Sequence, residues 1–173
     1  MRKSIFSVRT LATMAMLAAV SVVLARLLIP MPNATTRFSI EGAPIILAGL
    51  VLGPLPGALV GWVADAVGCL FSAYGYNPLF SVPPVLLGLC AGWMRRWVRE
   101  KPGFLRVLLS FLPAVVLGSV LWQSYWLSFL YGSKSFGAFL ISRSIQFAVT
   151  SVLNALMVHG VLRSGIMDRF QSR

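Results

Sequence analysis

Apolar stretches long enough to cross a lipid bilayer recur along almost the whole chain. About 20 apolar residues span the hydrocarbon core of a bilayer as a helix. Of the 173 residues, 58% are hydrophobic and only 11% are charged. A soluble domain of this length would carry a larger share of charged side chains on its surface. The sequence therefore predicts an all-α integral membrane protein, because the backbone must be satisfied internally inside lipid.

We expect six transmembrane helices that form one bundle, a single membrane domain over residues 1–173. The first apolar run is long enough to span and is followed by further spans, so we interpret it as a helix and not as a cleavable signal peptide. The expected spans cover approximately residues 8–29, 43–51, 57–71, 79–98, 104–129 and 136–162.

The formal net charge of +11 indicates how the protein is oriented in the membrane and does not indicate a nucleic-acid partner. Most basic residues cluster near the N-terminus, between spans 4 and 5, and after span 6. By the positive-inside rule these ends are cytoplasmic, so both termini are expected in the cytoplasm. The remaining cations fall on or near the outer side: Arg26, Arg37, Lys134 and Arg143.

Span 3 carries small residues along one face together with a single acid, Asp65. The small residues are Gly57, Gly61, Ala64 and Gly68. Such a face allows another membrane helix to pack closely. A carboxylate at this depth is costly, so Asp65 should point toward protein or water and away from lipid. The prolines at 54 and 56 make a continuous helix through spans 2 and 3 improbable and predict a tight turn over residues 53–56.

Two further segments are open to more than one interpretation. Ala12, Ala15 and Ala19 form a small-residue stripe on span 1. This stripe either packs within the bundle or docks a second membrane protein. The outer segment at about residues 30–43, with two prolines and aromatic and cationic residues, is either a lid over the bundle or an inert connector.

Span 6 carries a polar stripe that should face the interior of the bundle. Arg143, Gln146, Thr150 and Asn154 follow the i, i+3, i+7, i+11 spacing of one helix face. Hydrogen bonds between helices could explain Thr150 and Asn154. Arg143 and Gln146 are harder to explain without a functional role.

The chain contains little that could support catalysis. It has no P-loop motif and a single histidine, His159, so neither a resident ATPase nor a multi-histidine metal site is expected. Asp65 and Asp168 are the only aspartates, and Asp168 lies in the expected cytoplasmic tail, which excludes an intramembrane aspartyl pair. We therefore expect no enzyme activity, no cofactor and no metal. Cys69 and Cys90 are expected to be free thiols, with a disulfide between them as the alternative.

The remaining aromatic, polar and cationic residues suit a ligand-recognition site at the outer end of the bundle. Aromatic faces, hydrogen-bonding edges and cations together suit a planar heteroaromatic ligand that bears carboxylates. The tyrosines could instead belong to an interfacial aromatic belt. The candidate substrate-binding residues are Arg26, Arg37, Phe38, Trp62, Asp65, Tyr76, Asn77, Gln123, Trp126, Arg143 and Gln146.

With these features the chain resembles the S components of energy-coupling factor (ECF) vitamin transporters, and within them the folate-specific branch, FolT. Six spans, the alanine stripe, a long first outer loop and basic inner ends match the family across the whole chain. The more specific motifs lie between about residues 26 and 92. They are Arg37-Phe38-Ser39, Pro44-Ile45-Ile46-Leu47-Ala48-Gly49, Gly53-Pro54, Gly57, Gly61 and Ala64-Asp65-x-x-Gly68.

The resemblance implies a vitamin-binding protein of the bacterial cell membrane. Such a component binds its vitamin in an outer cavity formed by the first loop and the outer ends of spans 4 to 6. It then docks, here through Ala12, Ala15 and Ala19, onto a transmembrane T subunit driven by two cytoplasmic ATPases. Arg26 and Arg37 match positions expected to bind the glutamate carboxylates of folate. Asp65 is either a ligand of the pterin amino group or a structural residue.

Two alternatives remain open at this stage. The same architecture could bind another vitamin, such as riboflavin, a thiamine precursor or a queuosine precursor. The chain could also be a membrane scaffold or assembly factor without a transport role.

Overall fold

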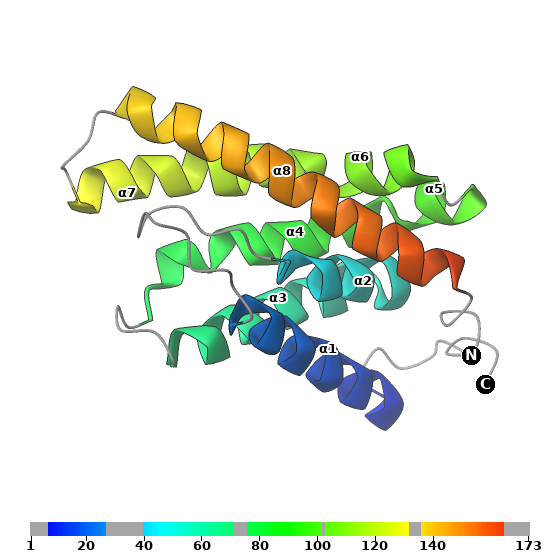
Figure 1. Ribbon diagram of the computed structural model, residues 1–173. Coiled ribbons are helices and arrows are strands. Elements are labelled where there is room, and N and C mark those ends of the chain that lie inside the picture. Colours follow the sequence, from blue (N-terminus) through cyan, green and yellow to red (C-terminus); the bar gives the residue numbers. More distant parts are fainter. Residues whose placement is uncertain (1–6, 27–39, 71–75, 102, 132–135, 165–173) are drawn as a thin grey trace.

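The computed structural model describes residues 7–26, 40–70, 76–101, 103–131 and 136–164. Every regular element in these ranges is helical (Figure 1). The α-helices are α1 (Val8–Arg26), α2 (Gly42–Leu52), α3 (Pro54–Leu70), α4 (Val82–Trp93), α5 (Arg95–Glu100), α6 (Phe104–Ala114), α7 (Gln123–Tyr131) and α8 (Phe136–Arg163). A 3-10 turn, η1 (Pro78–Phe80), precedes α4, and a π-helix, η2 (Val115–Trp122), joins α6 to α7.

By length and composition, three of the described helical segments can cross a membrane. They are Val8–Ala25, Phe104–Trp126 and Arg143–Arg163. Three shorter apolar helical segments accompany them: Gly42–Leu52, Pro54–Leu70 and Pro78–Trp93. The expected all-α membrane protein is thus confirmed, and the six apolar segments fall close to the six expected spans.

The shortest of the apolar helices, α2, lies in the middle of the bundle. Ile46 and Ala48 on α2 are completely buried. One apolar cluster packs α2 with α4, α6 and α8, and a second packs it with α1 and α3. Because α2 is surrounded by other helices, its side chains are almost uniformly apolar and carry no polar face.

The boundary between α2 and α3 is a single residue, Gly53, whose φ of 116° favours glycine. The predicted turn over residues 53–56 is therefore shorter than expected. Pro54 and Pro56 lie in the first turn of α3, where a missing backbone N–H leaves no hydrogen bond unmade. The Arg95 guanidinium donates a hydrogen bond to the Leu52 carbonyl at the end of α2, at 3.3 Å.

Helices α3 and α4 approach one another so closely that their backbones touch. A Cβ atom added at Gly57 would lie 2.7 Å from the Gly88 carbonyl oxygen, and one added at Gly61 would overlap the Pro84 carbonyl. Ala64 is buried on the same face. This confirms the predicted small-residue face. Gly68 is the exception, because a Cβ there would meet nothing within 4 Å.

Two details in the second half of the chain differ from expectation. The expected span over residues 79–98 is divided, because α4 ends at Trp93 and residues 95–100 form the separate short helix α5. The expected span over residues 104–129 is continuous, but it changes from α to π hydrogen bonding after Pro113. A proline inside a helix removes a backbone donor and clashes with the carbonyl four residues earlier, and π-segments are frequent at functional sites.

Candidate functional site

The polar stripe of α8 faces the interior of the bundle, as predicted. Gln146, Thr150 and Asn154 are each less than 9% exposed. The Thr150 hydroxyl donates to the Gln146 carbonyl at 3.1 Å, and the Asn154 amide donates to the Thr150 carbonyl at 2.9 Å. These two donors therefore bond back to α8 itself, and hydrogen bonds between helices do not account for them.

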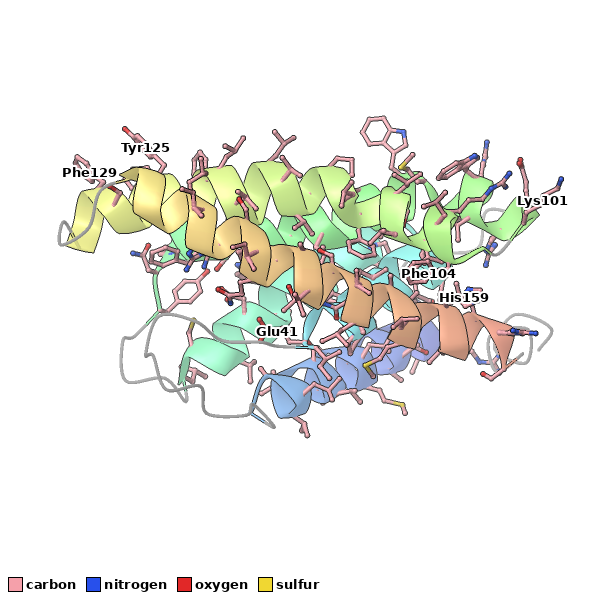
Figure 2. The ribbon with its side chains drawn as sticks, turned by 45° about the horizontal axis from the view of Figure 1, so that its top comes forward. Glu41, Lys101, Phe104, Tyr125, Phe129 and His159 are labelled. Atoms are coloured by element: carbon pink, nitrogen blue, oxygen red, sulfur yellow. The ribbon has the colours of Figure 1, made fainter. Side chains whose placement is uncertain are left out.

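Several buried polar atoms on α7 and α8 have no hydrogen-bond partner among the described residues. They are Ser124 Oγ, Trp126 Nε1, Arg143 Nη1, Asn154 Oδ1 and, toward the other end of α8, His159 Nδ1 (Figure 2). Buried polar atoms are nearly always paired with protein or water, so each exception requires an explanation. Leaving one unpaired costs about 1–3 kcal/mol, and more for a charged group. A ligand held between α7 and α8 would explain this cost for Trp126 Nε1 and Arg143 Nη1.

The Trp126 ring belongs to a cluster of aromatic side chains on and next to α7. The Trp126 ring lies 5.9 Å from Trp122, 5.8 Å from Tyr125 and 5.9 Å from Phe129, measured between ring centroids. Figure 2 shows Tyr125 and Phe129 at one end of the bundle, on α7. These contacts are the tilted and edge-to-face arrangements that aromatic pairs prefer, so the cluster presents ring surface in a defined orientation.

A half-buried cation, Arg143, lies on α8, the helix that follows α7. The Arg143 guanidinium carbon lies 5.8 Å from the centroid of the Phe147 ring, a cation–π contact along the same helix. Its Nη1 makes no hydrogen bond to any described residue. An arginine edge is the protein group best suited to bind a carboxylate through two parallel hydrogen bonds.

A second group of predicted residues lies around Asp65 on α3. The Ser81 hydroxyl donates to Asp65 Oδ2 at 2.5 Å. Ser81 Oγ also lies 3.2 Å from the Tyr76 hydroxyl oxygen, to which the Trp62 indole donates at 3.2 Å. Three predicted site residues, Trp62, Asp65 and Tyr76, are therefore joined in one hydrogen-bonded chain through Ser81.

The turn η1 connects the hydrogen-bonded residues around Asp65 with the aromatic cluster of α7. The Asn77 side chain accepts a hydrogen bond from the Leu79 amide at 3.1 Å and so caps η1. The Trp122 indole donates to the Leu79 carbonyl at 2.9 Å. Because Trp122 also contacts Trp126, the Asp65 group and the α7–α8 group meet at Leu79.

Some of the predicted residues lie outside the part of the chain that the structure describes. Arg37, Phe38 and Lys134 are among them, as is most of the expected lid at residues 30–43. The lid's last two residues belong to α2 and are buried. Arg26 ends α1, but its side chain is not described. Gln123 begins α7 and is half-buried.

Two serines in these groups were not predicted as site residues. Ser81 is 4% exposed and Ser124 is fully buried. Serine is too common for its presence alone to mark a site. The position of Ser124 beside Gln123, in a segment already rich in polar and aromatic residues, was the one available signal.

The alanine stripe of α1 lies on the outside of the bundle. Ala12, Ala15 and Ala19 are exposed, whereas Met14 and Ala18 on the opposite face are buried against α2 and α3. The stripe therefore does not pack within the bundle, which was one of its two interpretations.

Basic residues gather at the end of the bundle opposite the aromatic group. Figure 2 shows Lys101, Phe104 and His159 at this end, far from Tyr125 and Phe129. The Arg106 guanidinium stacks on Trp97 at 5.2 Å from the ring centroid and donates to the Trp97 carbonyl at 3.0 Å. The bundle is thus polarised along its length, with the candidate site at one end.

Comparison with known proteins gives a family and a fold. The family model for the substrate-specific component of ECF transporters matches residues 9–163. A curated relative, a UPF0397 protein of Streptococcus pneumoniae (strain CGSP14), is 29% identical over 98 residues, which are 57% of this chain and 54% of the relative. The chain thus spans about half the length of the curated relatives it matches.

Solved structures of ECF components match over nearly the whole chain. The crystal structure of FolT bound with folic acid superposes with a TM-score of 0.74 at 28% identity, over 89% of this chain and 92% of that one. The S-component for biotin from an ECF-type ABC transporter superposes with a TM-score of 0.70 at 18% identity, over 94% and 95%. The second likeness concerns the fold alone.

The family model covers most of the chain, the helical bundle has the fold of these solved components, and its apolar segments suit a bilayer. The chain therefore belongs to the substrate-specific components of ECF transporters, multi-pass proteins of the bacterial cell membrane that serve transport and are not enzymes.

Proposed function

We propose that this chain is an S component that captures folate outside the cell and delivers it together with an energising module. The observation that carries the proposal is a pair of buried donors without a hydrogen-bond partner among the described residues: Trp126 Nε1, in the aromatic cluster of α7, and Arg143 Nη1 on the neighbouring helix α8. Folate combines planar rings with a glutamate moiety, so aromatic faces would stack on the rings and guanidinium groups would bind the carboxylates. The likeness to FolT bound with folic acid supports folate among the vitamins.

The residues that we assign to folate follow from their chemistry. Arg143 would bind a carboxylate, in company with Arg26 and Arg37. Trp62, Tyr76 and Trp126 would supply ring surface, together with Phe38. The hydrogen-bonding edges would come from Asn77, Gln123 and Gln146, and Asp65 takes a separate role described below.

The proposal includes six spans with both termini in the cytoplasm. The described basic residues that support this orientation lie at the end formed by α5, the start of α6 and the end of α8 (Figure 1). They are Arg95, Arg96, Arg99, Lys101, Arg106 and Arg163. Cytoplasmic placement of that end puts the aromatic group outside, where substrate arrives. Residues 30–43 would then cover the site as a lid.

Calorimetric titration of the detergent-purified chain tests the substrate. Folate should give a saturable heat, whereas riboflavin, thiamine and biotin should give none. Heat with one of these other vitamins and none with folate would reject folate and keep a vitamin-binding role. If none of the four vitamins gave a saturable heat, the result would contradict the vitamin-binding role and favour a membrane scaffold.

The partners in this proposal are a transmembrane T subunit and two cytoplasmic ATPases, reached through the exposed alanine stripe. Small residues let helix backbones approach closely, so a bulky side chain should prevent docking. Ala15→Trp should leave folate affinity unchanged and abolish folate uptake in cells that contain the module. Val20→Trp is the matched control, because Val20 is also exposed on α1 but lies away from the stripe. Normal uptake by Ala15→Trp would contradict the docking role.

A further inference from the structure

With Asp65 ionised, the hydrogen bonds around it take one direction. An indole N–H can only donate and an ionised carboxylate can only accept. The single Ser81 hydroxyl proton is directed to Asp65 at 2.5 Å. The 3.2 Å contact between Ser81 Oγ and the Tyr76 oxygen must therefore be a hydrogen bond donated by Tyr76.

The result is a chain of donors that ends on the carboxylate. Trp62 donates to Tyr76, Tyr76 donates to Ser81, and Ser81 donates to Asp65. Hydrogen bonds that point in one direction polarise and strengthen one another, and those to an ionised acceptor are short and strong. This accounts for an acid on a membrane helix, where an unpaired carboxylate would be costly.

We propose that Asp65 is a positioning residue that holds the segment 76–81 in place for substrate and does not contact substrate itself. The inference rests on the proposed function. On one side the segment is held by Asp65 through Ser81, and on the other by the Trp122 indole, which donates to the Leu79 carbonyl. Because Trp122 packs against Trp126, the carboxylate on α3 helps to set the position of the aromatic cluster on α7.

If Asp65 positions the segment 76–81, substitutions along this series of hydrogen bonds should weaken folate binding by predictable amounts. Asp65→Ala removes the final acceptor and should weaken folate binding about tenfold, the order expected for hydrogen bonds to a charged group. Ser81→Ala should weaken binding to a similar degree. Asp65→Asn keeps an acceptor oxygen for Ser81 and should retain most of the affinity. Tyr76→Phe removes the hydroxyl in the middle of the series of hydrogen bonds. Its loss of folate affinity should lie between those of Asp65→Asn and Asp65→Ala.

A double variant separates positioning from direct contact. If Asp65 acts through Ser81, then Asp65→Ala with Ser81→Ala should bind folate no more weakly than either single variant, because both remove the same interaction. If Asp65 contacts folate, the two losses should add, and Asp65→Asn should be as defective as Asp65→Ala. Additive losses would overturn the proposal.

Hydrogen exchange of the backbone amides at residues 79–81, measured without folate, makes the test independent of the substrate. Asp65→Ala and Ser81→Ala should both speed exchange at these amides, and Asp65→Asn should leave it close to that of the unmodified chain. The amides of α6 serve as an internal reference that neither substitution should affect. Unchanged exchange at residues 79–81 in Asp65→Ala would overturn the proposal even if folate proves not to be the substrate.

Discussion

The α3–α4 pair and the α7–α8 pair bury their polar groups in opposite ways. Between α3 and α4, glycines bring backbone against backbone, and the one acid in this region accepts a hydrogen bond from Ser81. On α7 and α8, several buried polar atoms have no hydrogen-bond partner among the described residues, and one of them, Trp126 Nε1, belongs to a cluster of aromatic rings. Among the described residues, the first pair leaves no buried polar side-chain atom without a hydrogen-bond partner, whereas the second pair leaves several.

This difference separates scaffold from site. Helices in lipid gain little from hydrophobic association, so close packing of small residues must supply much of their stability. The α3–α4 pair can therefore hold the bundle together in every state of the protein. The α7–α8 pair carries donors without a partner among the described residues, and a bound ligand would recover the cost of burying them. The predictions that follow test each side of this comparison.

The largest effect is expected on the scaffold side. Gly57→Ala would place a methyl group 2.6 Å from Gly49 Cα and 2.7 Å from the Gly88 carbonyl oxygen. Neither neighbour is a flexible side chain, so the helices must separate, at a cost of about 2 kcal/mol or more. Gly68→Ala is the matched control on the same helix, because its new methyl group meets nothing within 4 Å. Unfolding in mixed micelles with increasing SDS measures the difference.

The scaffold interpretation would fail if the two variants unfolded together. Gly68→Ala should be neutral or slightly stabilising, by up to about 1 kcal/mol, because alanine favours a helix over glycine. Equal destabilisation of both variants would mean that helix α3 tolerates no substitution for reasons unrelated to its contact with α4.

Particular residues show how far the sequence could predict the difference between the α3–α4 pair and the α7–α8 pair. The spacing of Gly57, Gly61 and Ala64 is a periodic signal, and it correctly predicted a closely packed face. The same spacing extends to Gly68, where an added methyl group would meet nothing within 4 Å, because periodicity describes one helix and contains no information about where its neighbour ends. Helix existence was thus predictable, whereas the length of each contact was not.

The site was less predictable because its contacts join distant parts of the chain. The residue types needed for recognition were evident, and Arg143 and Gln146 were correctly expected on an inward face. The partner of Asp65, however, is a serine 16 positions later, and the acceptor of the Trp122 indole is a carbonyl 43 positions earlier. No pattern of spacing indicates such pairs, which depend on how helices are placed in three dimensions.

The next largest effect is expected on the site side, at Arg143. Arg143→Ala should weaken folate binding by about 10- to 100-fold, since it removes charge-assisted hydrogen bonds to a carboxylate. The folate-free bundle should lose little stability, because the substitution also removes a buried cation with an unpaired N–H. Calorimetry gives the affinity and SDS unfolding gives the stability.

Arg163→Ala is the control for this loss. Arg163 is on the same helix but in its last turn, at the opposite end of the bundle, and is exposed. It should bind folate as tightly as the unmodified chain. A matching loss of affinity in both variants would point to a general electrostatic effect and would remove Arg143 from the site.

The smallest effect, and the sharpest contrast, comes from two serines that are both completely buried. Ser110 on α6 donates to the Val107 carbonyl at 2.7 Å, whereas Ser124 Oγ on α7 has no partner among the described residues. Ser110→Ala should destabilise the folate-free bundle by about 1 kcal/mol, because a hydrogen bond is lost. Ser124→Ala should stabilise it by up to a similar amount, because an unpaired polar group is removed.

Folate should then raise the melting temperature of Ser124→Ala by less than that of Ser110→Ala, since only Ser124→Ala removes a hydroxyl that would contact folate. If both alanine variants were destabilised equally and gained equally from folate, Ser124 would be an ordinary packing residue, and the contrast between the two pairs of helices would not extend to it.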